Sequence, residues 1–292
     1  MKRIFLLAAL WAPAVFAQES VTFSLSYQPS SVYQISHEID ADNVLSFAGD
    51  HSQLPEKLKG RIPLSFKMRK YKNTEIVTGG VSENGGYPIK LSVTSDTTYA
   101  GINGSPLKQV SDSSKSARGL TVDGVISSDG QFDITAVSGS KVKKSDEQLI
   151  KSIFEQLSAL KAFEGKTVSV GEVLSLETPI KIQVPTIGIM DYQIDIDYKL
   201  ESIEQGMASF RPDYKLKIAS NIKGQSIAVD GKGQGILTYD IENQLTSENS
   251  STIELQMDIP THFGVFNFSS VAKSTSSTSR ERIPLSTLHI QE

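Results

Sequence analysis

The chain of 292 residues contains no cysteine, which excludes disulfide bonds, thiol nucleophiles and cysteine-ligated metal sites. A secreted animal domain of this size often carries disulfide bonds, so their absence favours a bacterial envelope protein. The one tryptophan is Trp11, close to the start of the chain. None of these features indicates a cofactor, and we expect none.

Long apolar runs and an excess of basic residues are also missing. After the first residues, no stretch approaches the roughly 20 apolar residues that a membrane-spanning helix requires. The net charge is −4 and the two signs are interspersed, whereas nucleic-acid binding usually shows a basic patch. We therefore expect no nucleic-acid partner and no transmembrane segment in the mature chain.

The first residues resemble a targeting segment. Lys2 and Arg3 precede an apolar stretch over residues 4–14, and residues 15–17 match the small-x-small cleavage pattern. We predict that residues 1–17 are a signal peptide cleaved between Ala17 and Gln18. The mature protein, residues 18–292, is then expected to be one β-rich domain. It would be exported to the periplasm or the extracellular space and soluble after cleavage.

Alternation of apolar and polar residues dominates the mature chain and predicts about a dozen antiparallel strands. Residues 192–201 alternate most regularly, and residues 62–69 do so as well. Residues 122–126 and 132–134 flank a turn that ends at Gly130, which predicts a hairpin. Residues 41–60 are less regular and are predicted to form a loop. The fold class is therefore mainly β, with an antiparallel curved sheet, two sheets or an open barrel.

One stretch, residues 145–165, predicts a helix. Ser145 and Gln148 form a capping box, and Gly165 can take the left-handed conformation that ends a helix. Apolar residues recur at spacings of three and four, which gives a broad apolar face. We predict one central α-helix over about 146–163, packed on the concave face of the sheet. If this helix covers a ligand cavity, the residues expected to line the cavity are Ile153, Phe154, Leu157 and Leu160.

Short blocks recur on both sides of this stretch. Residues 122–124 and 229–231 both read Val-Asp-Gly, and an aromatic-Asp-Ile block follows each of them. Two pseudo-repeats, about 20–144 and 166–292, joined by the helix 145–165, are one interpretation.

Motifs for catalysis are weak. No two of the four histidines have the spacing of metal ligands on a helix, and no metal site is expected. Asp195 and Asp197 share one face of a strand, about 7 Å apart, which is compatible with a carboxylate-dependent hydrolase. A solvated outer face explains the same pattern more simply. The glycine-rich residues 231–235 lead into a strand and not a helix, so they favour a bulged hairpin over a phosphate loop.

About a quarter of the chain, residues 145–208, resembles a family of uncharacterised exported bacterial β-rich proteins classed as a domain of unknown function. The motifs are a Val-x-Val-Gly-acidic turn after a helix, and a Tyr-x-Leu strand that closes on a glycine and a small residue. The matching residues here are Val168, Val170, Gly171, Glu172, Tyr198, Leu200, Ile203, Gly206 and Ala208. Leu174 stands where the family often has tryptophan. The resemblance implies an exported β-rich fold and no known activity. The predicted architecture is also loosely similar to the open, helix-plugged barrels of periplasmic lipoprotein carriers.

The function that these observations favour is non-catalytic. We expect an exported envelope protein that binds an apolar small molecule or a lipid between sheet and helix. The alternative is a structural or assembly partner of another envelope protein. A hydrolase based on Asp195 and Asp197 is the third possibility.

Overall fold

The computed structural model describes residues 19–24, 27–56, 58–110, 117–139, 164–184, 188–218, 221–222, 225–226 and 228–283. These residues form antiparallel strands and one short 3₁₀ helix, without any α-helix among them. The prediction of a mainly β, antiparallel fold is confirmed. The predicted central helix is not supported, because residues 140–163 lie outside the described ranges, as do Ile153, Phe154, Leu157 and Leu160. The predicted cleavage site at Ala17 and Gln18 lies outside them too.

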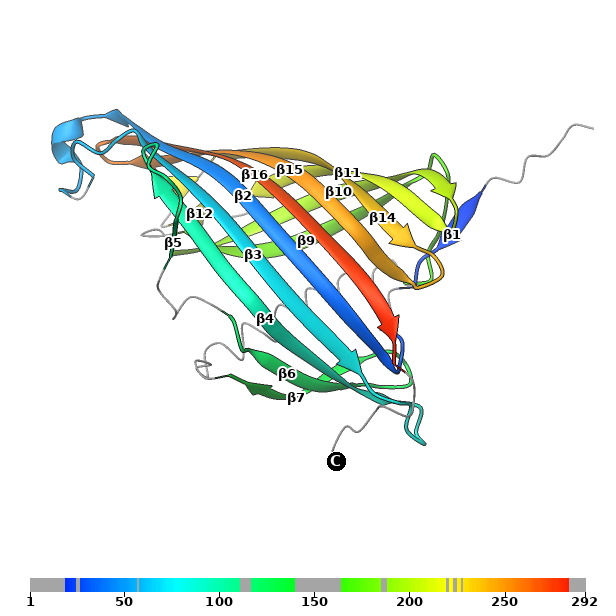
Figure 1. Cartoon of the computed structure of the whole chain (residues 1–292). Coiled ribbons are helices and arrows are strands. Elements are labelled where there is room, and N and C mark those ends of the chain that lie inside the picture. The colour runs from blue at the N-terminus through cyan, green and yellow to red at the C-terminus, as the bar shows by residue number, and fades with distance from the viewer. Residues whose placement is uncertain are drawn as a thin grey trace, which may run out of the picture.

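The strands before residue 140 run outward from the middle of the sheet (Figure 1). The 3₁₀ helix η1, His51–Gln53, follows the first long strand. The strands are β1 (Ser20–Thr22), β2 (Ser31–Gly49), β3 (Leu64–Thr78), β4 (Tyr87–Ile102), β5 (Lys108–Gln109), β6 (Thr121–Ile126) and β7 (Phe132–Ser138).

The strands after residue 163 begin at the opposite edge and return to the middle. They are β8 (Thr167–Ser169), β9 (Val173–Val184), β10 (Gly188–Glu204), β11 (Met207–Ile218), β12 (Asn221–Ile222), β13 (Gln225–Ser226), β14 (Ala228–Asp240), β15 (Leu245–Thr261) and β16 (Gly264–Arg282).

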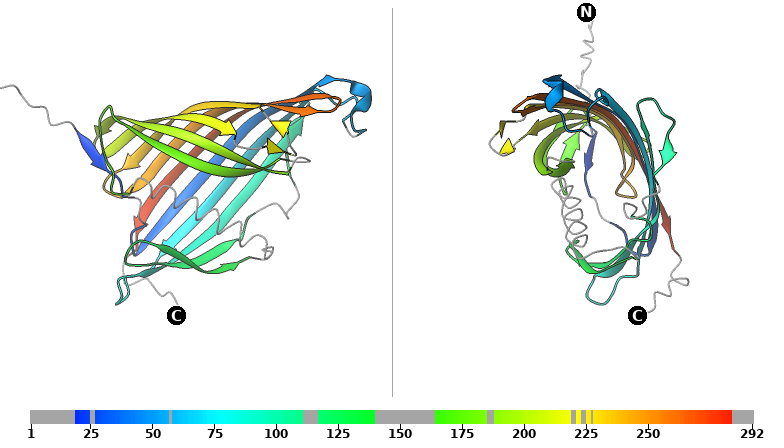
Figure 2. Two further views of the ribbon diagram at one scale, coloured as in Figure 1. Left: turned by 180° about the vertical axis from the view of Figure 1, so that it is seen from behind. Right: turned by 90° about the vertical axis from the view of Figure 1, so that its left-hand side faces the viewer.

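Twelve of these strands form one antiparallel sheet in the order β7-β6-β4-β3-β2-β16-β15-β14-β11-β10-β9, with β5 paired to β4. The two longest strands, β2 and β16, have 19 residues each and pair along their whole length at the centre. Figure 2 shows that the sheet is strongly curved, so that β6 and β7 on one side and β9 and β10 on the other bend toward each other. Among the described strands, β7 and β9 end the sheet, and the barrel is not closed.

The two faces of the sheet differ sharply, as one transverse row shows. Side chains alternate between the two faces along each strand, whereas residues paired across neighbouring strands lie on the same face. A row of paired residues across the nine strands from β4 to β9 therefore stays on one face. The inner row is Ala100, Met68, Ala41, Ala272, Ile253, Gly233, Tyr214, Ile196 and Leu176. The adjacent outer row is Tyr99, Arg69, Asp40, Lys273, Thr252, Gln234, Asp213, Asp197 and Ser175. We call the face of the first row the inner face and that of the second the outer face.

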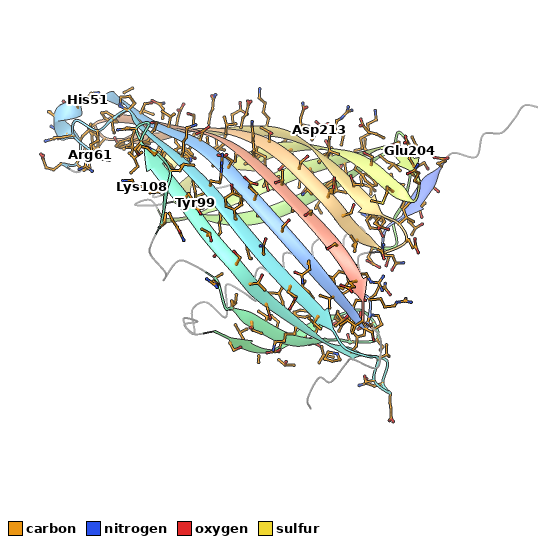
Figure 3. All side chains as sticks on the ribbon, viewed as in Figure 1. His51, Arg61, Tyr99, Lys108, Glu204 and Asp213 are labelled. Carbon is orange, nitrogen blue, oxygen red and sulfur yellow. The ribbon has the colours of Figure 1, made fainter. Side chains whose placement is uncertain are left out.

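The inner face lies on the concave side. The short sheet of β1 and β8 packs on it near one end of the curve, where Phe23 contacts Phe210 and Tyr239 with ring centroids 5.1 and 5.0 Å apart (Figure 2). A second buried core, around Tyr33 and Ile76, fills the inner face where β6 and β7 curl over. The outer face carries ion pairs and exposed polar side chains, and Tyr99 and Asp213 are labelled there in Figure 3. The polar side therefore faces solvent and the apolar side faces inward.

Hydrogen bonds with Tyr239 hold the segment that follows β1 against the inner face. The Tyr239 hydroxyl donates to the Ser24 carbonyl oxygen at 2.7 Å and accepts from the Ser24 backbone N–H at 3.1 Å. Replacing Tyr239 with Phe is expected to lower the free energy of unfolding by about 1–3 kcal/mol, because two hydrogen bonds to part-buried backbone groups are lost. Urea denaturation measures the change. The same substitution at Tyr99, on the outer face, should alter stability by less than about 0.5 kcal/mol; equal effects would contradict this role of Tyr239.

Several local predictions can now be judged. The regular strand over 192–201 and the hairpin around Gly130 are confirmed, and Gly165 has a positive φ of 72°. The predicted loop at 41–60 is partly wrong, since β2 continues to Gly49. Acidic residues such as Asp40 and Asp42 suggested a loop, but both occupy outer positions of β2. Their carboxylates face solvent and form ion pairs with Arg69 and Lys67.

The bulged hairpin predicted at residues 231–235 is also wrong. Gly231, Gly233 and Gly235 lie mid-strand on the inner face of β14. Side chains from β11 occupy the space that they leave: a Cβ at Gly231 would lie 2.7 Å from the Leu216 Cβ. The sequence blocks that suggested a repeat fall on two strands, β6 and β7, before residue 140 but mainly on the single strand β14 after residue 163. The division into two pseudo-repeats stays a prediction.

Candidate functional site

The inner face between the two cores is the candidate site. Many of its apolar side chains are half-buried, although Ala41, Phe47 and Met257 are buried, as are the side chains of the two cores. Toward the end near η1 the face becomes aromatic: Phe47 contacts Phe266 at 4.8 Å and Phe263 at 5.5 Å between ring centroids, and Phe66 lies 6.4 Å from Phe268. The half-buried inner residues are Ile39, Leu45, Phe66, Met68, Ile253, Leu255, Ile259, Phe266, Phe268 and Ala272.

A small ionisable cluster interrupts this apolar surface. His37, Lys72 and Asp96 are direct partners across β2, β3 and β4, and Lys70 is the next inner residue on β3. The Asp96 carboxylate is fixed: its side chain is 2% exposed, it lies 3.2 Å from the Lys70 Nζ, and it accepts the Ala117 backbone N–H at 2.6 Å. The cluster therefore combines two lysines with one carboxylate.

Burial on the inner face shifts the pKa of its titratable groups. Burial lowers the pKa of Lys72 below its usual value of 10.5, and the positive charge of Lys70 lowers it further, although Asp96 acts in the opposite direction. Burial also lowers the pKa of His37 below 6.5, with contributions from Lys72 and Lys70, so the imidazole is neutral at pH 7. Burial raises the pKa of the Tyr198 and Tyr214 phenols on the same face. In each case the uncharged form is favoured, which is the effect of an apolar environment.

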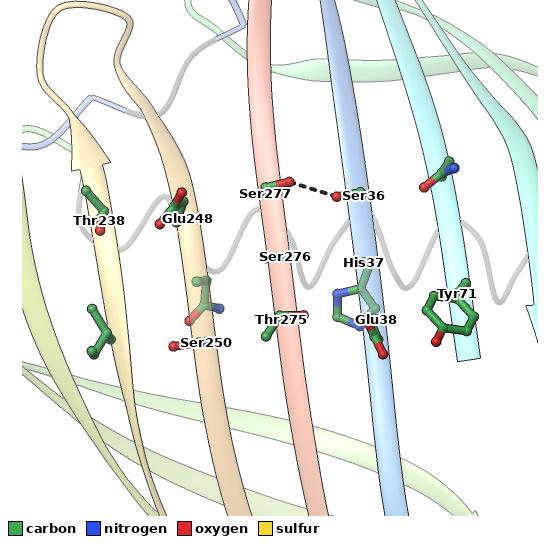
Figure 4. Close-up of a pocket in the computed structure, with 13 residues that line it drawn as sticks. Ser36, His37, Glu38, Tyr71, Thr238, Glu248, Ser250, Thr275, Ser276 and Ser277 are labelled. Atoms are coloured by element: carbon green, nitrogen blue, oxygen red, sulfur yellow. Dashed lines mark hydrogen bonds between the residues drawn. The ribbon is translucent and has the colours of Figure 1, made fainter. Parts of the chain in front are cut away.

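The outer face has a depression of about 560 Å³ that crosses β14, β15, β16, β2 and β3 (Figure 4). Its floor is rich in hydroxyl groups, and the Ser36 and Ser277 hydroxyls bond to each other at 2.7 Å. Glu38 and Glu248 are in the lining, and neither lysine nor arginine occurs among the lining residues that the structure describes. Ser36 and His37 are consecutive in a strand and so point to opposite faces, which does not suit a serine nucleophile with a histidine base.

Asp195 and Asp197 lie on the outer face, as the simpler interpretation expected. The Asp197 carboxylate accepts from the Ser175 hydroxyl at 2.6 Å and lies 3.3 Å from the Lys215 Nζ. These two groups hold the pKa of Asp197 below its usual value, with the Ser175 bond making the largest contribution. A general acid needs a raised pKa instead, so this geometry does not support a carboxylate-dependent hydrolase.

Other predicted features are distributed as follows. The residues that carry the family resemblance do meet: the Gly171 N–H donates to the Leu200 carbonyl at 2.8 Å, and the Leu200 N–H donates to the Glu172 carbonyl at 3.0 Å. Within the described ranges no three His, Asp or Glu side chains are grouped as a metal site would require. The same ranges also contain no helix long and apolar enough to cross a bilayer.

The cluster around Lys72 was not predicted from the sequence, although the sequence contains a signal for it. Phe66 and Met68 mark the apolar side of their strand, and Lys70 and Lys72 continue at the same even spacing. Charged residues on the apolar side of an amphipathic strand indicate a candidate functional site.

Comparisons with known proteins establish no family. No family model matches the chain, and no curated protein matches it. One solved structure, described as "Lipid-protein interactions in lipovitellin", is similar over 88% of this chain with 11% sequence identity and a TM-score of 0.48. The chain spans about a quarter of that protein's length, 26%. A likeness at this level establishes neither fold family nor function.

Proposed function

We propose that this protein is a non-catalytic binding protein of the bacterial envelope, which holds an apolar ligand such as a lipid against the inner face. The observation that carries the proposal is the transverse inner row, which is free of charged side chains across nine strands. Eight inter-strand spacings of about 4.8 Å make this row about 38 Å wide. A surface of that size on one concave face exceeds what two small cores need, and the half-buried side chains of the inner face around this row can bind a hydrocarbon chain.

Export supports the same proposal from the sequence, since residues 1–17 have the features of a signal peptide. An assembly role is the alternative, favoured by the two edge strands β7 and β9, to which another chain could add a strand. That role leaves the apolar inner face without an explanation.

Two measurements test ligand binding. The mature protein, purified without detergent, is extracted and its lipids are identified by mass spectrometry. The uncharged dye N-phenyl-1-naphthylamine is then titrated in and displaced with methyl oleate. We expect about one acyl lipid per chain, or a rise in dye fluorescence that methyl oleate reverses. Absence of both lipid and dye binding would contradict the proposal.

A further inference from the structure

The ionisable cluster on the inner face has an excess positive charge at Lys72. Asp96 offsets Lys70, from which it is 3.2 Å away, and its other oxygen accepts the Ala117 N–H. His37, the partner of Lys72 on β2, is neutral at pH 7. Lys72 itself forms no ion pair with any residue that the structure describes. The inner face thus combines a broad apolar surface with one uncompensated cation.

A cation in such surroundings is unfavourable unless a ligand pairs with it. Transfer of a charged ammonium group from water into an apolar environment is strongly disfavoured, and an opposite charge with direct hydrogen bonds offsets that penalty. Lys67, on the solvent-exposed outer face of the same strand, has a partner there: its Nζ lies 2.8 Å from the Asp42 carboxylate. Lys72 differs from Lys67 in burial and in having no ion-pair partner among the residues that the structure describes, so an anionic group of a ligand can pair with it.

We propose that the inner face binds an amphiphile with one acyl chain and a single anionic headgroup, and that the headgroup pairs with Lys72. This inference rests on the proposed function and adds the chemical class of the ligand. A carboxylate and a phosphodiester share the required chemistry, since each carries one negative charge and oxygen acceptors for the ammonium group.

The surroundings of Lys72 also set the direction of the acyl chain. On one side along β3, Ile76 belongs to a filled core with Tyr33 and Tyr87. On the other side, beyond Lys70 and its ion pair with Asp96, the inner residues Met68 and Phe66 are half-buried and lead to the aromatic cluster with Phe268. The six residues from Lys72 to Phe66 span about 20 Å. One bilayer leaflet has a hydrocarbon depth of about 15 Å, so an ordinary acyl chain fits in this direction.

Oleate and methyl oleate provide the test, because they share one chain and differ in charge. Each displaces N-phenyl-1-naphthylamine from the wild-type protein and from Lys72→Met, which keeps an unbranched side chain one heavy atom shorter and removes its charge. We expect the wild type to bind oleate about tenfold more tightly than methyl oleate, and Lys72→Met to lose that preference with unchanged affinity for methyl oleate. Lys67→Met removes the same charge from the outer face of the same strand and should leave both affinities unchanged. Lys72→Arg should keep the preference.

Lysophosphatidylglycerol with an oleoyl chain, compared with oleate, identifies the source of the anion. Tighter binding of lysophosphatidylglycerol than of oleate indicates a phospholipid, and the reverse order indicates a fatty acid; either result supports the anionic site. Equal binding of oleate and methyl oleate by the wild type, or an undiminished preference in Lys72→Met, would overturn the headgroup site and leave the apolar site intact. If neither oleate nor methyl oleate binds, the proposed function is overturned as well. Thermal melting of each variant verifies that it is folded.

Discussion

Replacing Gly233 and Gly235 together with alanine is expected to lower the free energy of unfolding by at least about 3 kcal/mol, because a new Cβ on the inner face of β14 has no room. At Gly235 the added Cβ would lie 2.2 Å from the Ser250 carbonyl oxygen. At Gly233 it would lie 2.6 Å from the Thr252 carbonyl oxygen. Both contacts are with the backbone of β15, which can yield only if the sheet flattens locally. Urea denaturation followed by circular dichroism measures the loss.

The matched control is Gly80→Ala. An ideal Cβ at Gly80 meets nothing within 4 Å, and its backbone conformation is not restricted to glycine. That variant should stay within about 0.5 kcal/mol of the wild type. If the double variant were as stable as Gly80→Ala, the glycines would have no part in the curvature, and their position on the inner face would need another reason.

Replacing Phe268 with Asp is expected to reduce affinity for methyl oleate by more than about tenfold, equivalent to at least about 1.4 kcal/mol of binding free energy. Phe268 lies on the inner face between Leu45 and Met257, its partners on β2 and β15, and faces Phe66. The substitution removes aromatic contact area and places a carboxylate where hydrocarbon is proposed to lie. Displacement of N-phenyl-1-naphthylamine measures the affinity.

Ser269→Asp is the control for Phe268→Asp, because it introduces the same charge one residue away on the exposed outer face. It should leave binding unchanged. If both variants lose affinity equally, the effect is one of net charge or stability and the ligand does not occupy the inner face. Melting temperatures separate these two explanations.

Local features of the fold could be predicted where the type of a residue alone indicates its environment or its backbone conformation. Tyr198 and Leu200 alternate with charged neighbours because one face of β10 is apolar and the other is solvated, and that contrast is visible in sequence. Gly130 marks its hairpin because the turn requires a positive φ, here 76°. These predictions needed no knowledge of which strands are neighbours.

Features that depend on neighbouring strands could not be predicted. Ala41 and Asn43 are small or polar, yet they occupy inner positions of β2; Ala41 lies between Met68 and Ala272, and the Asn43 amide donates to the Phe66 carbonyl at 3.3 Å. Gly233 is explained by the backbone of Thr252 on the neighbouring strand β15. The cluster of His37, Lys72 and Asp96 likewise requires the register of three strands.

The central pairing of β2 with β16 has a consequence for how the chain folds. Each of its 19 residue pairs joins positions more than 200 residues apart, from Gly49 with Gly264 to Ser31 with Arg282. Contacts this distant in sequence must close a very long loop before they contribute free energy, so a topology of high contact order folds slowly. The middle of the sheet cannot form until residues 264–282 have been synthesised. The nascent polypeptide therefore remains without its central strand pair throughout most of translation.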